Sequence, residues 1–234
     1  DNNEFLVNLT GGAYDFFLIF GYDYLRLKDT YQMRPILVGQ HDEESVLEEL
    51  LLITSSAVDT FTDLSEATLL IPRGTGELPI RWLNQWLASQ NLGNGDKYIQ
   101  FTETTDNVSK AVLPVFFGKA DACVVPRSGY NVMKELNPQI GQRTKILAQS
   151  KPLLKSLLCL SPTYVEKEDG LVKREGLRLN RLPHGEQLIT LLRMKKLVAW
   201  DPAFLQNLKE LLQSDSEQPT NIVDTTHGGE TDEL

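Results

Sequence analysis

Residues 67–87 read ATLLIPRGTGELPIRWLNQWL, and this stretch decides how the rest of the chain is interpreted. The short apolar run Ala67–Pro72 predicts a buried strand, because it is bounded by a proline and by glycines. Apolar residues then recur at helical spacing at Ile80, Leu83, Trp86 and Leu87. The stretch therefore predicts a strand that leads through a tight loop, residues 73–76, into a helix.

The loop Arg73-Gly74-Thr75-Gly76 is the first candidate binding site. The first turn of a helix has free N–H groups and a positive dipole end, and both attract an anion. Glycines on both sides of Thr75 let backbone and ligand approach closely. The loop is not a Walker loop, because Lys-Ser/Thr is missing after the second glycine. A second interpretation stays open, in which Thr75 is the N-cap of an ordinary strand–helix turn.

Composition limits the classes of partner. The chain has 234 residues and can hold one large domain or two small ones with real cores. Its net charge of −9 argues against nucleic acid or an anionic membrane as partner. Residues 214–234 carry six acids and no Lys or Arg, which leaves −3 for the body, since −9 minus −6 is −3. Their polar, acidic composition predicts a disordered tail.

Several classes of function find no support in the sequence. No apolar run approaches the ~20 residues of a membrane span. The chain starts at Asp1 without Met or a signal peptide, so we expect a processed product, a fragment or an observed subset. Cys123 and Cys159 lie in apolar, strand-like runs and are expected to be free, buried thiols. His41, His184 and His227 are isolated, with no metal spacing among them, so we predict no metal site. We also expect no cofactor, and no nucleophile–base pairing indicates a catalytic motif.

Predicted strands and helices alternate along the chain. The predicted strands are Tyr14–Phe20, Met33–Gly39, Lys97–Phe101, Ala120–Pro126, Thr144–Gln149 and Ser156–Leu160. Leu47–Ser55 is compatible with a helix or a strand, and a strand is favoured at its end. The predicted helices are residues 2–10, a short helix ending at Leu27, Asp106–Phe117, Ser128–Leu136, Gly185–Leu197 and Pro202–Leu212. Such alternation indicates an α/β fold with a parallel or mixed sheet whose faces are covered.

Several segments, taken in order, resemble a known family. Gly118-Lys119-Ala120-Asp121-Ala122 precedes the apolar run Cys123–Pro126, and the turn Ser150-Lys151-Pro152 comes later. Together they resemble the phosphate/phosphite/phosphonate substrate-binding proteins of bacterial ABC transporters. The loop at residues 73–76 matches that family's Ser-Thr-Ser-Gly anion loop, and Thr104-Thr105-Asp106-Asn107 matches its Ser-His-Asp-Asn segment with threonine in place of histidine.

The family's earlier Gly-x-Asp strand and tyrosine match Gly12-Ala13-Tyr14-Asp15 and either Tyr22 or Tyr24, so the likeness covers roughly residues 5–212. The resemblance implies a two-lobed, type 2 periplasmic-binding-protein fold. Each lobe would be a mixed sheet flanked by helices, and a strand hinge would let the lobes close over ligand.

The resemblance also implies where the lobes lie in the sequence. Lobe 1 would be residues 1–53 plus 148–213, and lobe 2 would be residues 54–147 with the anion loop 73–76. The family's opening strand, helix and strand have no counterpart after Asp1. Lobe 1 is therefore expected to be incomplete at its N-terminus.

The function implied by the resemblance is a periplasmic or otherwise extracytoplasmic receptor that passes a small oxyanion to an ABC permease. Two alternatives stay open: a ligand-sensing domain of a signalling protein, and an enzyme on the same fold, for which we can name no nucleophile and base. In phosphonate binders carboxylates receive the ligand's amine, but Pro126-Arg127 and Ser150-Lys151 stand in those places here. Phosphate, phosphite or a simple phosphonate is therefore expected, and an aminophosphonate is not.

The matched positions give the candidate ligand-binding residues. Gly74, Thr75 and Gly76 would donate hydrogen bonds to anionic oxygens, and such bonds are roughly twice as strong as neutral ones. Thr105 would add a hydroxyl, or else cap the next helix. Arg127 follows a strand at its carboxyl end, the usual ligand edge of an open α/β sheet, unless it forms a surface ion pair.

Three further residues complete the expected site. Tyr22 and Tyr24 would close over the ligand from lobe 1, or else pack in the core with satisfied hydroxyls. Asp121 is expected to be structural and to orient loop amides.

Overall fold

The computed structural model describes residues 2–41, 45–64, 66–73, 76–93, 98–165, 170–192 and 194–213. Two sequence predictions fall outside these ranges: the anion loop at Gly74 and Thr75, and the disordered tail at residues 214–234.

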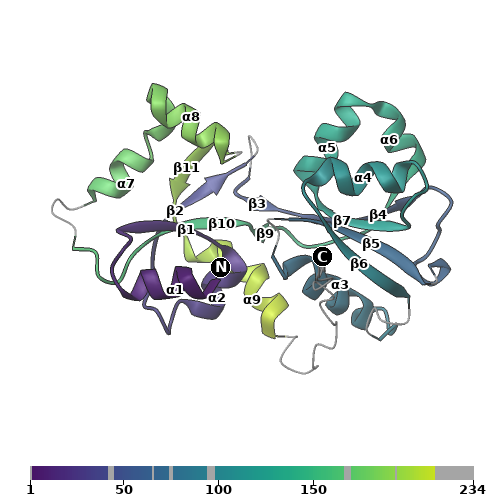
Figure 1. Ribbon diagram of the computed structural model, residues 1–234, viewed down its shortest axis with the longest axis horizontal. Helices are drawn as coiled ribbons and strands as arrows, with labels where there is room; N and C mark the ends of the chain where they lie inside the picture. The colour runs from purple at the N-terminus through teal and green to yellow at the C-terminus, as the bar shows by residue number, and fades with distance from the viewer. Residues whose placement is uncertain are drawn as a thin grey trace, which may run out of the picture.

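One half of the molecule is built on a four-stranded sheet (Figure 1). Its order is β1 (Phe16–Phe20), β10 (Ser156–Leu160), β2 (Arg34–Gln40) and β11 (Lys196–Ala199), and each neighbouring pair is antiparallel. One side carries α1 (Asn2–Thr10) and α2 (Gly21–Leu27), and the other carries α7 (Leu171–Gly176) and α8 (Pro183–Leu191). This half is called lobe 1 from here on.

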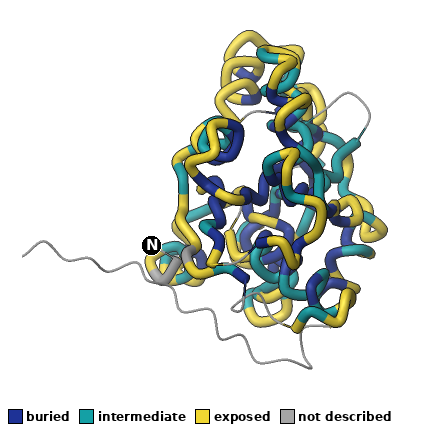
Figure 2. Tube along the Cα trace, turned by 90° about the vertical axis from the view of Figure 1, so that its right-hand side faces the viewer, coloured by how far each residue is buried: buried dark blue, intermediate teal, exposed yellow. Residues whose placement is uncertain are grey.

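The other half, called lobe 2 from here on, is built on a five-stranded mixed sheet. Its order is β6 (Ile99–Thr105), β5 (Ala67–Pro72), β7 (Ala122–Pro126), β4 (Leu50–Ser55) and β8 (Thr144–Gln149), with β5 parallel to β6 and β7. On one side lies α3 (Leu78–Ser89), and on the other lie α4 (Val108–Phe116), α5 (Arg127–Leu136) and α6 (Pro138–Arg143). The inner strands are mostly apolar and buried because helices cover both faces, and Figure 2 shows this buried interior inside exposed helices and loops.

The lobes are joined by two extended segments. The short strands β3 (Leu47–Glu48) and β9 (Leu153–Leu154) pair antiparallel between the lobes. Ser150 fixes the segments to each other, since its hydroxyl accepts a hydrogen bond from the Leu50 amide (2.9 Å) and donates to the carbonyl of Lys151 (2.7 Å). Residues 50–53 and 148–149, which the sequence analysis placed in lobe 1, pair within the sheet of lobe 2.

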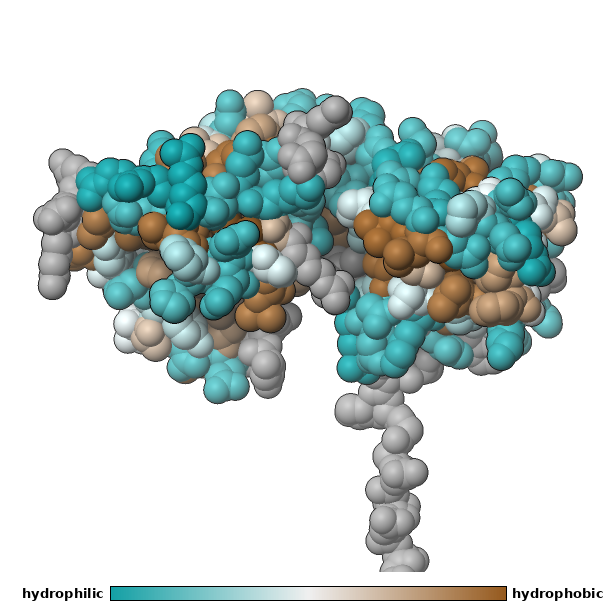
Figure 3. Space-filling view, turned by 90° about the horizontal axis from the view of Figure 1, so that it is seen from above, coloured by the Kyte–Doolittle hydropathy of each residue, from teal (hydrophilic) through white to brown (hydrophobic). Residues whose placement is uncertain are grey.

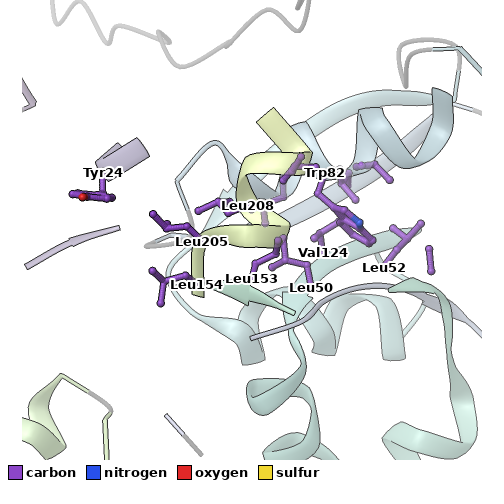
Figure 4. Packing of buried hydrophobic residues seen from close by; sticks show 14 of the residues in the cluster. Tyr24, Leu50, Leu52, Trp82, Val124, Leu153, Leu154, Leu205 and Leu208 are labelled. Atoms are coloured by element: carbon purple, nitrogen blue, oxygen red, sulfur yellow. The ribbon is translucent and has the colours of Figure 1, made fainter. Parts of the chain in front are cut away.

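A single hydrophobic core crosses from one lobe to the other. It contains Leu157 and Cys159 of lobe 1, Leu52 and Val124 of lobe 2, and Leu154 of the hinge. The C-terminal helix α9 (Gln206–Gln213), which follows the short helix η4 (Pro202–Leu205), adds Leu208 and Leu211. Figure 4 shows Leu205 and Leu208 between Tyr24 on one side and Trp82 and Val124 on the other.

The sequence analysis was wrong about residues 185–197. The expected helix ends at Leu191, and Lys196–Ala199 forms strand β11. Just after the helix, the amide of Met194 donates to the carbonyl of Ile189 (2.9 Å). The amide of Lys195 then donates to the carbonyl of Gln40 in β2 (2.8 Å). Pairing with β2 thus overrides the helical pattern. Strand β6 also runs on from the predicted Phe101 to Thr105, because it pairs with β5 to the end.

Cys123 and Cys159 are free and buried, as predicted. They lie in different sheets, on β7 and β10 respectively. Burial raises the pKa of both thiols, that of Cys159 to about 12, so thiolate is scarce at neutral pH. We expect a thiol reagent such as 5,5′-dithiobis(2-nitrobenzoate) to detect no thiol in the native protein and two per chain in guanidinium chloride. Fast labelling of the native protein would contradict the packing described here.

Candidate functional site at the junction of the lobes

The carboxyl ends of three strands of lobe 2 lie at one edge of its sheet. Since β5, β6 and β7 are parallel, Pro72, Thr105 and Pro126 end side by side, and α3, α4 and α5 begin just beyond them. The edge meets the hinge, because the amide of Arg127 donates to the carbonyl of Glu49 (2.9 Å). Seen from above, a hollow separates the lobes (Figure 3). The edge at the carboxyl ends of β5, β6 and β7 is the one at which open α/β sheets bind ligands.

Gly76, the last residue of the predicted anion loop, lies within the described residues, and its backbone shows why glycine is favoured there. Gly76 has φ of +61°, and a Cβ there would meet no described atom within 4 Å, so backbone conformation rather than crowding favours glycine. Helix α3 begins at Leu78 with Glu77 at the N-cap position. Thr75 itself lies outside the described residues, so its N-cap interpretation stays a prediction.

Thr105 ends β6 at this edge, but it does not cap the next helix. Asn107 is the N-cap of α4, and its side chain accepts a hydrogen bond from the amide of Lys110 (3.0 Å). The Thr105 hydroxyl donates to the carbonyl of Asn107 (3.1 Å). Thr105 also lines a cavity of about 490 Å³ that reaches Phe117 beyond the far end of α4. That cavity runs along the outside of lobe 2 rather than between the lobes.

Arg127 is held by an ion pair, as the competing interpretation expected. Its guanidinium is paired with the carboxylate of Glu49 and donates to the side chain of Gln149 (2.6 Å). The next residue, Ser128, donates both its amide (3.1 Å) and its hydroxyl to the carboxylate of Glu48. The hinge thus supplies two acids to the start of α5, where the matched segments themselves offer none.

The two tyrosines occupy different places. Tyr24 packs in the core with its ring 6.0 Å from that of Trp200, and burial raises its pKa to about 12. Tyr24 thus packs in the core, which was the alternative to its closing over the ligand at the lobe junction. Tyr22 is also buried, yet its hydroxyl reaches lobe 2 and donates to Oε2 of Glu77 (3.3 Å). Burial raises the pKa of Tyr22 as well, so its hydroxyl remains a donor at neutral pH.

Asp121 is structural, but not at the binding edge. Its carboxylate accepts the amide of Thr68 (2.8 Å), and its own amide donates to the carbonyl of Thr68 (3.3 Å). Both residues precede or begin strands, so the pair lies at the opposite end of β5 and β7 from the loop at residues 73–76. The expectation that Asp121 orients loop amides is corrected to an amide of a strand. Arg73 is exposed, 3.9 Å from the carboxylate of Asp106.

Sequence reasoning missed a charged group at the junction. Arg26 of α2 and Arg81 of α3 both contact Glu77, with nearest separations of 3.6 Å and 3.0 Å. The spacing of Glu77 and Arg81, four residues apart at the start of a predicted helix, is typical of a helical ion pair and could have identified them. Tyr22 and Arg26 come from the other lobe, and nothing in the local sequence links them to Glu77.

Two further features bear on what the molecule can bind. A cavity of about 300 Å³ is lined from lobe 2, the hinge and α9, by residues that include Trp82, Trp86, Gln149, Lys151 and Glu210. Lys151 is paired there with Glu210 (2.7 Å). Within the described ranges, no cluster of three or more His, Cys, Asp or Glu side chains is placed to hold a metal ion. In the same part of the chain, no helix is long and apolar enough to span a bilayer.

Solved structures resemble this fold along most of the chain. A binding-protein component of an ABC phosphonate transporter from Pseudomonas aeruginosa matches with a TM-score of 0.69 at 12% identity, covering 96% of this chain and 77% of that one. PhnD1 from Prochlorococcus marinus, in complex with methylphosphonate, matches with a TM-score of 0.63 at 10% identity, covering 91% and 82%. XAC2383 from Xanthomonas citri, bound to chloride, gives 0.65 at 13% identity, covering 93% and 82%.

These likenesses establish the type 2 periplasmic-binding-protein fold. No curated protein matches the sequence significantly. A family model described as "ABC transporter, phosphonate, periplasmic substrate-binding protein" matches residues 1–204. The chain therefore belongs to the family of phosphonate-binding periplasmic proteins of ABC transporters.

Proposed function

We propose that this protein captures a small oxyanion (phosphate, phosphite or a simple phosphonate) at the junction of its lobes and delivers it to an ABC permease outside the cytoplasm. Membership of a transport family supports a binding role rather than catalysis. The ligand would contact the loop at residues 73–76, with the Tyr22 hydroxyl reaching it from lobe 1.

One observation carries this proposal: three parallel strands end, and three helices begin, at the edge of lobe 2 that faces the hinge and Tyr22. Helix N-termini present the positive ends of their dipoles and N–H groups that have no partner within the helix. The first amides of α5 already donate to the hinge, so the proposal relies on the loop before α3 for donors to the anion. A small anion bound there would also contact residues of both lobes, so its binding would favour the closed arrangement.

A thermal-shift screen tests the proposal. The probes are phosphate, phosphite, methylphosphonate, 2-aminoethylphosphonate and sulfate, and methylphosphonate is included because PhnD1 binds it. A ligand at 100 times its Kd stabilises the native state by about 2.7 kcal/mol, which raises the Tm of a protein of this size by roughly 5 to 10 °C. If none of the five anions raises the Tm or gives heat in calorimetry, the proposal is wrong.

We further expect 2-aminoethylphosphonate to bind no better than methylphosphonate. The acids at the start of α5 are already engaged, Glu49 by Arg127 and Glu48 by Ser128. An amine would therefore have to compete with Arg127 for a carboxylate. Calorimetry with both ligands measures the preference, and a tenfold advantage for the aminophosphonate would contradict this expectation.

Arg127→Met sharpens the comparison. It frees Glu49, so the ratio of aminoethylphosphonate to methylphosphonate affinity is expected to rise several-fold, since a charged pair of this kind contributes about 1 kcal/mol. Lys151→Met is the matched control. Lys151 pairs with Glu210 of α9 instead, so its loss should leave the ratio unchanged.

A further inference from the structure

The lobe junction holds a tyrosine ring under two guanidinium groups from different lobes. The Cζ atom of Arg26, on α2, lies over the Tyr22 ring at 5.4 Å from its centroid. The Cζ atom of Arg81, on α3, lies over the same ring at 5.3 Å. Contacts of this kind are attractive and hold the planar cations in place. Two positive charges are therefore gathered around a buried phenol where the lobes meet.

Glu77 supplies a carboxylate that these groups share. Its Oε2 atom accepts from the Tyr22 hydroxyl (3.3 Å) and from Nε (3.2 Å) and Nη2 (3.0 Å) of Arg81, and Nη1 of Arg26 lies 3.6 Å away. A single oxygen thus faces donors from both lobes. A guanidinium and a hydroxyl converging on one point form the kind of donor set that binds carboxylate, phosphate or phosphonate oxygens.

The side chains of this cluster differ in how readily each can leave it for water. The Arg81 side chain is only 22% exposed, whereas that of Glu77 is 58% exposed. Arg81 has lost much of its hydration and needs a counter-ion, while Glu77 can turn into water at small cost, because exposed ion pairs contribute little. The acid of the cluster is therefore more readily replaced than Arg81.

We propose that Tyr22, Arg26 and Arg81 form an oxyanion subsite across the lobe junction, and that Glu77 fills it until the ligand's oxygens replace the carboxylate. This inference rests on the proposed function, since it concerns the same oxyanion and the same closure. Glu77 then sets the affinity of the receptor, because every ligand must compete with it. Without ligand it contacts Tyr22 and Arg26 of lobe 1 from its place on lobe 2.

The charges around the cluster agree with this exchange. Asp23, the next residue on α2, is near enough to Arg26 and Glu77 for both to affect its pKa, which burial raises. Arg73 is paired with Asp106, and Arg127 with Glu49. Arg26 and Arg81, by contrast, contact Glu77 in common and face it from opposite lobes. An arriving anion thus meets two cations that share Glu77 as a partner.

Titration calorimetry of the full chain with methylphosphonate, phosphate, phosphite and sulfate tests the inference. Glu77→Gln removes the competing charge, so affinity for the anion that binds the wild type best should rise about three- to tenfold. Arg81→Gln should lower it about tenfold or more, and Arg81→Lys should fall between, because lysine keeps the charge but not the fork of donors. Thermal unfolding without ligand checks that each variant is folded.

Asp59→Asn is the matched control. Asp59 is an exposed acid of lobe 2 paired with Lys145 (2.9 Å), so the variant changes net charge as Glu77→Gln does without touching the junction. Its affinity should equal that of the wild type. If the wild type binds an anion and Glu77→Gln binds it equally or more weakly, Glu77 is a structural contact and the inference is overturned, while the proposed function stands. Absence of binding to all four anions in the wild type and every variant overturns both.

Discussion

Leu208→Ala is expected to lower the free energy of unfolding by about 2 to 5 kcal/mol, the range for removing a fully buried leucine. Leu208 lies on α9 and is completely buried, and its side chain approaches Gly21, where a Cβ would be 3.1 Å from Leu208 and 2.4 Å from the carbonyl oxygen of Leu154. The wall opposite the leucine is partly main chain and cannot collapse to fill a cavity. For a chain of this size, each kcal/mol lowers the Tm by about 2 to 4 °C.

Because the core is continuous through α9 and the hinge, we expect one cooperative transition rather than separate unfolding of each lobe. Guanidinium chloride titration followed by far-UV circular dichroism and by tryptophan fluorescence measures both quantities. Leu191→Ala is the matched control, since Leu191 is 78% exposed on α8 and should change stability by less than about 0.5 kcal/mol. Equal effects of the two substitutions, or two separate transitions, would show that α9 does not unite the lobes.

The elements that sequence predicted best are those whose pattern is local. Ala67–Pro72 reads as a strand because a buried parallel strand is continuously apolar and ends at a proline and glycines, and the structure gives β5 the same bounds. The helix at residues 202–212 is likewise recognisable from its apolar spacing, although its first turn is η4 and only its remainder is α9. Strand β11 could not be predicted, since Lys196–Ala199 is a strand only through its pairing with β2.

The candidate site was harder to predict, for the same reason. The ends of β5 and β7 could be placed from the strand–helix alternation alone, whereas β6 continues past its predicted end to Thr105. The contact between Tyr22 and Glu77 could not, because it joins residues 55 positions apart and depends on how α2 meets α3. The engagement of Arg127 by Glu49 likewise spans 78 positions and needs the hinge. Local sequence patterns thus predict most of the strands and helices. They do not predict which charged groups meet, because those contacts join residues far apart in the sequence.

Thr75→Ala is expected to reduce the affinity for the captured oxyanion roughly 10- to 150-fold, with little change in stability. A hydrogen bond to a charged group contributes about 1.5 to 3 kcal/mol, and each 1.4 kcal/mol is a factor of ten. Thr75 lies outside the described residues, but its neighbours limit the alternatives. Glu77 holds the N-cap position of α3, so loss of the Thr75 hydroxyl should not cost the 0.5 to 2 kcal/mol of a missing cap, a range typical of N-cap residues.

Calorimetry and a denaturant melt on the same variant separate these two roles. Thr10→Ala is the matched control: Thr10 ends α1, is exposed, and bonds only within its own helix among the described contacts, so affinity should be unchanged. Gly76→Val should weaken binding at least as strongly as Thr75→Ala, because a β-branched residue at a φ of +61° costs more than the 1 to 2 kcal/mol typical of L-residues and would displace the loop. Lost stability with unchanged affinity in Thr75→Ala would place the anion elsewhere on this edge and leave the arginines at the lobe junction as its principal donors.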